Sequence, residues 1–145
     1  MVKTLTMSDR DLVTAVLQLA NLLNRRLSPI FEKSKITPQQ WAVLAVLSEY
    51  EEPTTLASIA KKLLVTKQNM TGMVSRLADL GLVDRNDDPK DLRSSRVELT
   101  RRGRTIVDKV RPAYEQWRDA LDVPERDRAT VQRVLDKLIE DLESR

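Results

Sequence analysis

The chain has 145 residues, of which 41% are hydrophobic and 32% are charged, a balance typical of one soluble domain with its own hydrophobic core. It contains no cysteine and no histidine, which excludes disulfides and nearly every zinc site and removes the commonest general base. We therefore expect no metal, no cofactor and no enzyme activity. The lack of a long apolar run or a signal-peptide core predicts a cytoplasmic protein that does not cross a membrane.

The formal net charge is only +3, but the charges are distributed unevenly along the chain. Residues 1–60 are neutral overall, residues 61–111 carry 13 basic and seven acidic side chains, and residues 112–145 are net acidic. A central basic segment is typical of local contact with a polyanion such as nucleic acid. A solvated surface can show a similar imbalance by chance, so the charge alone does not decide the partner.

Two helices are expected before residue 54. In the first, Ser8 is a candidate N-cap, and apolar residues recur at helical spacing from Leu12 to Phe31. They cover more than one face, which predicts burial against a partner subunit. The second starts with a capping box, Thr37-Pro38-Gln39-Gln40, and we expect the following Trp41 to pack in the core.

Two shorter helices should follow a brief strand at Thr54-Thr55, with Thr55 as the cap of the first. The first has one apolar face, formed by Leu56, Ile59, Ala60 and Leu63. Thr66 is the predicted cap of the second, and Gly81 supplies its left-handed end. So short a joint between two helices is typical of a helix-turn-helix.

A β-hairpin is predicted next. Residues 82–85 and 96–99 alternate between apolar and polar side chains, which indicates two strands. We expect residues 86–95 to join them, with a turn at 88–91. A hairpin that follows a helix-turn-helix in this way is a wing.

The remaining chain is predicted to be helical. Thr100 is a candidate cap, and Pro112 should kink the helix or start a second segment. After a break at residues 122–124, the last helix carries an apolar stripe that must dock against another surface to escape water. The stripe consists of Val131, Val134, Leu135, Leu138, Ile139 and Leu142.

The exposed face of the second short helix is suited to the major groove of DNA. Amide side chains can bind adenine, hydroxyls can bind bases or phosphates, and an arginine can bind phosphate or guanine. The residues that we predict to bind DNA here are Lys67, Gln68, Asn69, Thr71, Gly72, Ser75 and Arg76. Each of them taken singly is more commonly ordinary solvated surface.

Two of these residues carry a cost for the free helix. Gly72 costs about 1 kcal/mol relative to alanine in a helix, which close approach to a surface would explain; packing inside the protein is the alternative. Lys67 opposes the helix dipole, typically by about 0.3–1 kcal/mol, which makes sense if a phosphate binds there.

In the wing, Lys90, Arg93 and Arg96 are predicted to contact DNA, with arginine inserted in the minor groove. Asp91 is predicted to pair with Arg93 and orient it. The alternative is a polar hairpin whose surface ion pairs contribute little.

The segment Asp91–Thr100, DLRSSRVELT, followed by Gly103, resembles the D-x-R-x-x-x-V-x-L-T signature of MarR-type regulators. The order of segments 37–41, 56–60 and 70–81 is also similar to that family. The resemblance implies a mainly α fold with a small β-hairpin wing (α+β), a winged helix-turn-helix whose N- and C-terminal helices interleave in a triangular homodimer. It also implies repression relieved by a small aromatic or phenolic ligand. The redox-sensing mechanism of one branch is excluded because there is no cysteine.

We therefore predict a single domain over residues 1–145, with a DNA-binding lobe at 37–100 and dimerisation helices at 1–36 and 101–145. The predicted function is that of a homodimeric, sequence-specific transcription regulator, a repressor released by a ligand. Its partner would be double-stranded DNA with a pseudo-palindromic operator. The alternative is a winged-helix dimerisation or adaptor module that binds protein rather than DNA.

Overall fold

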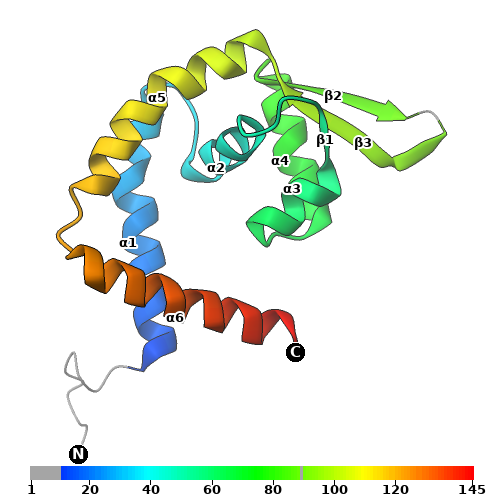
Figure 1. The fold of residues 1–145 in the computed structure, drawn as a ribbon. Coiled ribbons are helices and arrows are strands. Elements are labelled where there is room, and N and C mark those ends of the chain that lie inside the picture. The colour runs from blue at the N-terminus through cyan, green and yellow to red at the C-terminus, as the bar shows by residue number, and fades with distance from the viewer. Residues whose placement is uncertain (1–10, 89) are drawn as a thin grey trace, which may run out of the picture. The chain divides into compact units, whose positions relative to one another are not determined.

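The structure is a computed structural model that describes residues 11–88 and 90–145, and only the backbone for 88 and 91–94. The fold is mainly helical with a small antiparallel sheet (Figure 1). The chain divides into two compact units between Tyr114 and Glu115. The elements are α1 (Leu12–Glu32), α2 (Pro38–Leu47), β1 (Thr54–Thr55), α3 (Leu56–Leu63), α4 (Lys67–Asp79), β2 (Val83–Asp88), β3 (Asp91–Leu99), α5 (Arg101–Asp119) and α6 (Glu125–Glu143).

The first two helices begin at side-chain caps. The N-cap of α1 is Asp11, whose carboxylate accepts a hydrogen bond from the Thr14 backbone N–H at 2.7 Å. The predicted cap at Ser8 is therefore wrong for the helix that is described, and Ser8 itself lies outside the described residues. The capping box of α2 is confirmed, because Thr37 and Gln40 each accept a hydrogen bond from the other's backbone N–H.

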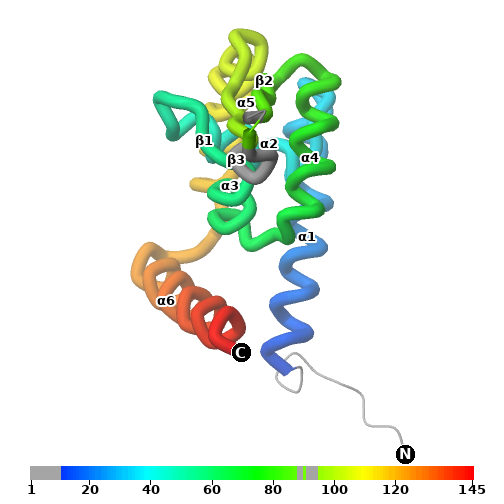
Figure 2. The backbone as a smooth tube through the Cα atoms, turned by 90° about the vertical axis from the view of Figure 1, so that its right-hand side faces the viewer, coloured from blue at the N-terminus to red at the C-terminus, as the bar shows by residue number. Residues whose placement is uncertain are grey.

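The predicted helix-turn-helix is confirmed in α3 and α4, which Figure 2 shows joined by a short turn. Thr55 and Thr66 are the two N-caps, as the sequence predicted. Leu64 occupies the turn in a left-handed conformation, with φ 57°. The residue is 54% exposed. Gly81 ends the second helix with φ 74°, a conformation that glycine adopts without steric cost.

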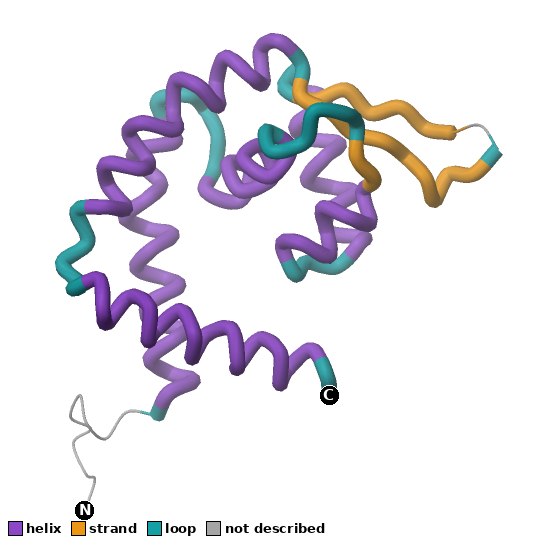
Figure 3. Tube along the Cα trace, in the orientation of Figure 1, coloured by secondary structure: helices purple, strands orange, loops and turns teal. Residues whose placement is uncertain are grey.

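The wing is longer than the sequence predicted. The sheet has the order β1-β3-β2, and both pairs are antiparallel (Figure 3). The two strands of the hairpin run to Asp88 and from Asp91, so most of the expected loop at 86–95 is strand and only residues 89–90 separate the strands. Propensity underestimates these polar strands because backbone pairing between neighbours, not side-chain alternation, holds them together. A register shift interrupts the pairing between Asn86 and Asp88.

The start of α5 is fixed to the end of α4 by a compact joint. The Thr100 hydroxyl donates to the Gly81 carbonyl at 2.7 Å and accepts from the Gly103 N–H at 3.0 Å. The bond from Gly103 is that of an N-cap, which confirms the prediction for Thr100. A Cβ on Gly103 would lie 2.1 Å from the Leu82 carbonyl oxygen. The glycine of the L-T-x-x-G pattern is therefore required because α5 meets the backbone at Leu82, just before β2.

α5 continues through Pro112 as one α-helix to Asp119. The prediction that Pro112 could start a second segment is wrong. The proline removes the N–H that would bond the carbonyl of Asp108, and water can reach that carbonyl because both Asp108 and Pro112 are exposed. The break after α5 is confirmed, since α6 begins at Glu125.

The core joins α2, α3, α4, the sheet and parts of α1 and α5. Phe31 of α1 stacks on Trp41 with ring centroids 5.6 Å apart, and Tyr114 of α5 lies 5.7 Å from Trp41. Arg111 donates to the Ser48 hydroxyl at 2.7 Å and lies over the Trp41 ring. Trp41 is therefore a core residue, as predicted.

The terminal helices leave their apolar stripes uncovered within the chain. In α1, Leu12, Val13, Val16, Leu17, Leu19 and Leu22 are exposed. No residue of α6 is buried, although its apolar stripe is intact. Among the described residues, no helix is both long and apolar enough to span a membrane.

Candidate nucleic-acid interface

α4 presents a polar face to solvent. Met70, Val74 and Leu77 are buried on its other side, which fixes the rotation of the helix. The exposed residues include all but one of those predicted from the sequence: Lys67, Gln68, Asn69, Gly72, Ser75 and Arg76. Thr71 is half-buried, and its hydroxyl donates to the Lys67 carbonyl at 2.9 Å. Its oxygen can still accept a hydrogen bond, but its proton is already used.

Gly72 lies at an open point of this face. A Cβ built there would have nothing within 4 Å outside the helix's own backbone. The alternative that Gly72 is required for packing inside the chain is therefore wrong. A flat, open helix surface is what close approach of another molecule needs.

A groove runs between this face and the N-terminus of α2. It has a volume of about 700 Å³, and Gln68, Gly72 and Arg76 line it on the α4 side. On the α2 side, Gln39 lines it and donates a hydrogen bond to Asn24 of α1 at 3.0 Å. The sequence analysis did not identify Gln39, because nothing in the local pattern shows that the first turn of α2 lies beside α4.

In the wing, the structure describes some of the predicted residues and not others. Lys90 and Arg96 are exposed. The side chains of Asp91 and Arg93 lie outside what is described, so their pairing stays a prediction. A described acid of the hairpin, Asp87, accepts hydrogen bonds from Arg85 Nε at 3.0 Å and Ser95 Oγ at 2.5 Å. The hydrogen bond from Ser95 is the largest cause that lowers the pKa of Asp87 from its ordinary value of 3.8, and the bond from Arg85 is the next.

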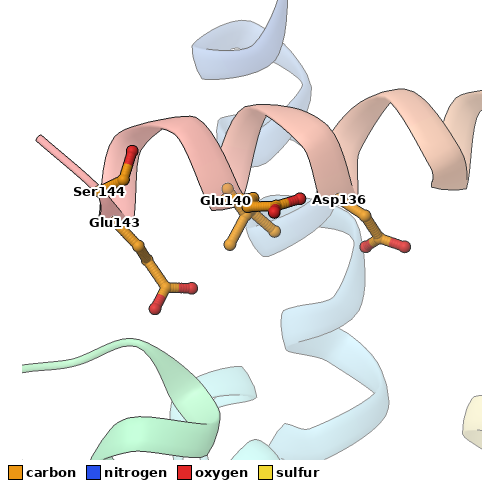
Figure 4. A pocket seen from close by; sticks show the side chains of 5 residues that line it. Asp136, Glu140, Glu143 and Ser144 are labelled. Carbon is orange, nitrogen blue, oxygen red and sulfur yellow. The ribbon is translucent and has the colours of Figure 1, made fainter.

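A second hollow, of about 330 Å³, lies at the C-terminal end of α6. Figure 4 shows Asp136, Glu140 and Glu143 along this part of the helix, and Ile139 and Ser144 complete the lining. Nowhere in the described part of the chain do three or more acidic, cysteine or histidine residues form a group that could hold a metal ion. The hollow is a shallow acidic surface, unlike the groove beside α4.

These features define a class of protein. The helix-turn-helix, a following antiparallel wing and a polar, open second helix together form a winged helix-turn-helix. Residues 34–94 match the model of the MarR family. An uncharacterized HTH-type transcriptional regulator of Mycobacterium leprae is 33% identical over 107 residues, which cover 74% of this chain and 71% of that protein. The chain belongs to the MarR family of transcriptional regulators, as the wing signature suggested, and its relatives are named as transcriptional regulators and not as enzymes.

Other relatives differ in the direction of regulation that their names give. The transcriptional activatory protein BadR of Rhodopseudomonas palustris is 36% identical over 94 residues, or 61% of this chain and 52% of BadR. This chain thus matches about half the length of BadR. The homoprotocatechuate degradative operon repressor of Escherichia coli is 25% identical over 106 residues, covering 73% of this chain and 71% of the repressor.

Solved structures share the fold. MepR of Staphylococcus aureus in a DNA complex aligns with a TM-score of 0.82 at 19% identity, over 91% of this chain and 98% of MepR. MarR of the same organism, in complex with salicylate and kanamycin, aligns with a TM-score of 0.75 at 19% identity, over 91% of this chain and 90% of that one. The mainly helical winged fold predicted from the sequence is confirmed.

Proposed function

We propose that the chain is a homodimeric regulator that binds double-stranded DNA at a pseudo-palindromic operator. The observation that carries the proposal is the exposed face of α4, with its amide, hydroxyl and guanidinium groups around an open glycine. In the major groove, Gln68 and Asn69 would bind base edges near the helix N-terminus. Ser75 and Arg76 would bind bases or phosphates farther along, with Thr71 as an acceptor.

The groove between α4 and α2 gives the DNA backbone a place to lie. Lys67 is the first residue of α4, where no acidic side chain occupies the first turn. A phosphate at this position would turn the unfavourable placement of a cation at a helix N-terminus into an attraction. Gln39, on the opposite side of the groove, is a further donor for phosphate. The wing residues Lys90, Arg93 and Arg96 would then contact the flanking minor groove.

We assign dimerisation to residues 1–36 and 101–145, and DNA binding to residues 37–100. A single lobe can read only one half-site, whereas a two-fold dimer reads two half-sites about one helical turn apart. The uncovered apolar stripes of α1 and α6 supply surfaces that a second copy can bury. This assignment accounts for the apolar residues of α1 and α6 that stay exposed within the chain.

For regulation, we propose repression that a small aromatic or phenolic ligand relieves. The E. coli relative is named a repressor, and the S. aureus neighbour was solved with salicylate, an aromatic acid. BadR is named an activator, so the direction of regulation is tested separately by reporter expression with and without the chain. A ligand acts only if it binds the non-DNA-binding state more tightly. Because the proposed partner is DNA, we place the protein in the cytoplasm.

The test is binding to a duplex selected by the wild-type protein from a random-sequence pool, at several salt concentrations. Gln68→Ala should weaken binding to the selected duplex by about tenfold, since a bidentate base contact contributes about 1–3 kcal/mol. Arg76→Ala should reduce the salt dependence by about one unit if it binds phosphate. Gln116→Ala and Arg126→Ala, which remove the same exposed side chains from α5 and α6, are the matched controls.

Equal binding of the selected and random duplexes by the wild-type protein would contradict sequence-specific regulation. Dimerisation must persist in all four variants, measured by sedimentation, so that lost binding reports on the DNA surface. The relatives are named transcriptional regulators, and no observation on the described residues favours the alternative of an adaptor that binds protein. Such an adaptor would select no duplex, so there would be no specific DNA binding for Gln68→Ala or Arg76→Ala to weaken.

A further inference from the structure

The pairing between the two strands of the wing is irregular at Asp87, where β3 has more residues between two paired positions than β2 has. Asn86 pairs with Arg96, and Asp88 pairs with Asp91. Asp87 alone therefore lies opposite the four residues 92–95 of β3, which form a bulge in the pairing. The predicted minor-groove residue, Arg93, belongs to this bulged segment. A bulge leaves residues without ladder hydrogen bonds, so another contact must hold the segment in place.

Asp87 supplies such a contact across the hairpin. Its Oδ1 atom accepts from Ser95 Oγ at 2.5 Å, at the last residue of the bulged segment, and from Arg85 Nε at 3.0 Å on its own strand. Ser95 is only 1% exposed, in contrast to the exposed Asn86 and Arg96 around it. A buried hydroxyl is costly without a partner, and a hydrogen bond to a carboxylate is among the stronger ones.

The ion pair with Arg85 cannot be the main contribution. Both side chains are partly open to solvent, at 29% and 47%, and exposed ion pairs contribute little. The bond to Ser95 differs because it joins β2 to the buried end of the bulge. The hydrogen bond from Ser95 is the largest cause that lowers the pKa of Asp87, so this bond favours the ionised carboxylate.

We propose that Asp87 is the positioning residue of the wing: through Ser95 it holds the bulged segment 92–95 at a fixed place on the hairpin, and so sets where Arg93 and Arg96 meet DNA. The inference rests on the proposed DNA-binding function. It assigns to Asp87 a role in the affinity for DNA that its negative charge, which repels phosphate, would not give it.

The two roles of Asp87 predict opposite effects on DNA affinity when the side chain is removed, so one substitution can distinguish them. Asp84 lies on the same strand, is exposed and carries the same charge, so Asp84→Ala and Asp87→Ala remove equal charge from the hairpin. If only charge matters, both variants bind the selected duplex as tightly as the wild type or more tightly. If Asp87 positions the wing, Asp87→Ala weakens binding by about tenfold while Asp84→Ala does not. Asp87→Asn, which keeps an acceptor oxygen, should recover part of the loss.

Hydroxyl-radical footprinting shows which part of the DNA site loses contact with the protein. Asp87→Ala should lose protection at the outer positions that the wings contact and keep protection at the two inner major grooves. Ser95→Ala deletes the donor alone and should reproduce this footprint, and the double variant should be no weaker than the weaker single variant. Ser95→Ala also decides the matter if Asp87→Ala does not fold, as judged by urea unfolding.

Three results overturn the inference. These are affinity of Asp87→Ala equal to that of Asp84→Ala, unchanged affinity of a folded Ser95→Ala, and equal loss of inner and outer protection. Each leaves the proposed function intact, because the wild-type protein still binds its selected duplex. If the wild-type protein selects no duplex at all, the proposed function fails first and the inference fails with it.

Discussion

The compact segment from α2 to β3 and the helices α1 and α6 carry the same kind of apolar periodicity. The compact segment buries its apolar stripes within the chain, whereas many apolar residues of α1 and α6 stay exposed. Ile59 of α3 is fully buried, whereas Leu17 of α1 is 60% exposed and Leu142 of α6 is 66% exposed. All three lie on apolar stripes that the sequence shows equally well. A stripe therefore predicts that a face will be covered, but not whether the same chain covers it.

α6 differs in how it begins from the helices of the α2–β3 segment, and also from α1 with its Asp11 cap. α2, α3 and α4 each start at a threonine whose side chain accepts a backbone hydrogen bond. α6 starts after Pro124 without a side-chain cap. The acidic residues in its first turn stabilise the positive end of the helix dipole. Short helices need caps and a core to persist, whereas a long helix that gains a partner surface depends on that partner. The following changes test each region separately.

The largest effect should come from Gly103→Ala, which disrupts the compact segment where α5 meets it. The new Cβ would lie 2.1 Å from the Leu82 carbonyl oxygen, and neither backbone can move without breaking the Thr100 joint. We expect a loss of about 3 kcal/mol in the free energy of unfolding, measured with urea. A Gly103→Ala protein as stable as the wild type would show that this joint is loose.

Leu19→Glu should disrupt the other region and leave the compact segment folded. Leu19 is 52% exposed on α1, and burying a leucine in an interface contributes about 1.5–3 kcal/mol. We expect the dissociation constant of the dimer to rise by at least about tenfold in sedimentation experiments. Leu64→Glu is the matched control, because Leu64 is 54% exposed but lies in the turn between α3 and α4. Equal effects of the two changes would contradict the assignment of dimerisation to α1.

Gly72→Ala should separate stability from function within the compact segment. Because nothing lies within 4 Å of the new methyl group, the free protein should gain about 1 kcal/mol of stability from the better helix propensity of alanine. The affinity for the selected duplex should fall, because the methyl group would keep α4 from close approach to DNA. Greater stability with unchanged affinity would show that Gly72 does not face the DNA.

Leu64→Gly should relieve strain in the turn between α3 and α4. Leu64 has a positive φ, which costs a residue with a Cβ about 1–2 kcal/mol. Its side chain is largely exposed, so its removal loses little burial. A gain of about 1 kcal/mol in urea unfolding is expected, partly offset by the greater freedom of glycine in the unfolded chain. A loss of stability would mean that the leucine side chain has packing value that outweighs its strained backbone.

The smallest effect is a pH dependence at the start of α1. The hydrogen bond from the Thr14 backbone lowers the pKa of Asp11 below 3.8 in the folded protein. Its contribution is therefore fully present above about pH 3.8 and is lost as the pH falls below that value. Circular dichroism should show less acid-induced loss of stability in Asp11→Ala than in the wild type. The same loss in both would exclude Asp11 as its source.

Local signals predicted the compact segment well because its helices have local causes. Thr37, Thr55 and Thr66 were identified as caps, and Gly81 as a left-handed end, from their own neighbours. The ends of the wing strands were not, since strand pairing depends on residues of the opposite strand. The same holds for the candidate site: the polar face of α4 follows from helical spacing, whereas Gln39 reaches it only because α2 packs nearby.

The sequence by itself determined the order of helices, the winged helix-turn-helix, the exposed face of α4 and the membership of the MarR family. These features follow from hydrogen bonds and spacings within a few residues, and from one extended signature in the wing. Only the tertiary structure decided that Gly103 is a packing glycine while Gly72 is an open one. It alone brought Asp87 to Ser95 across the bulge, because contacts between residues on different strands depend on register and not on local sequence.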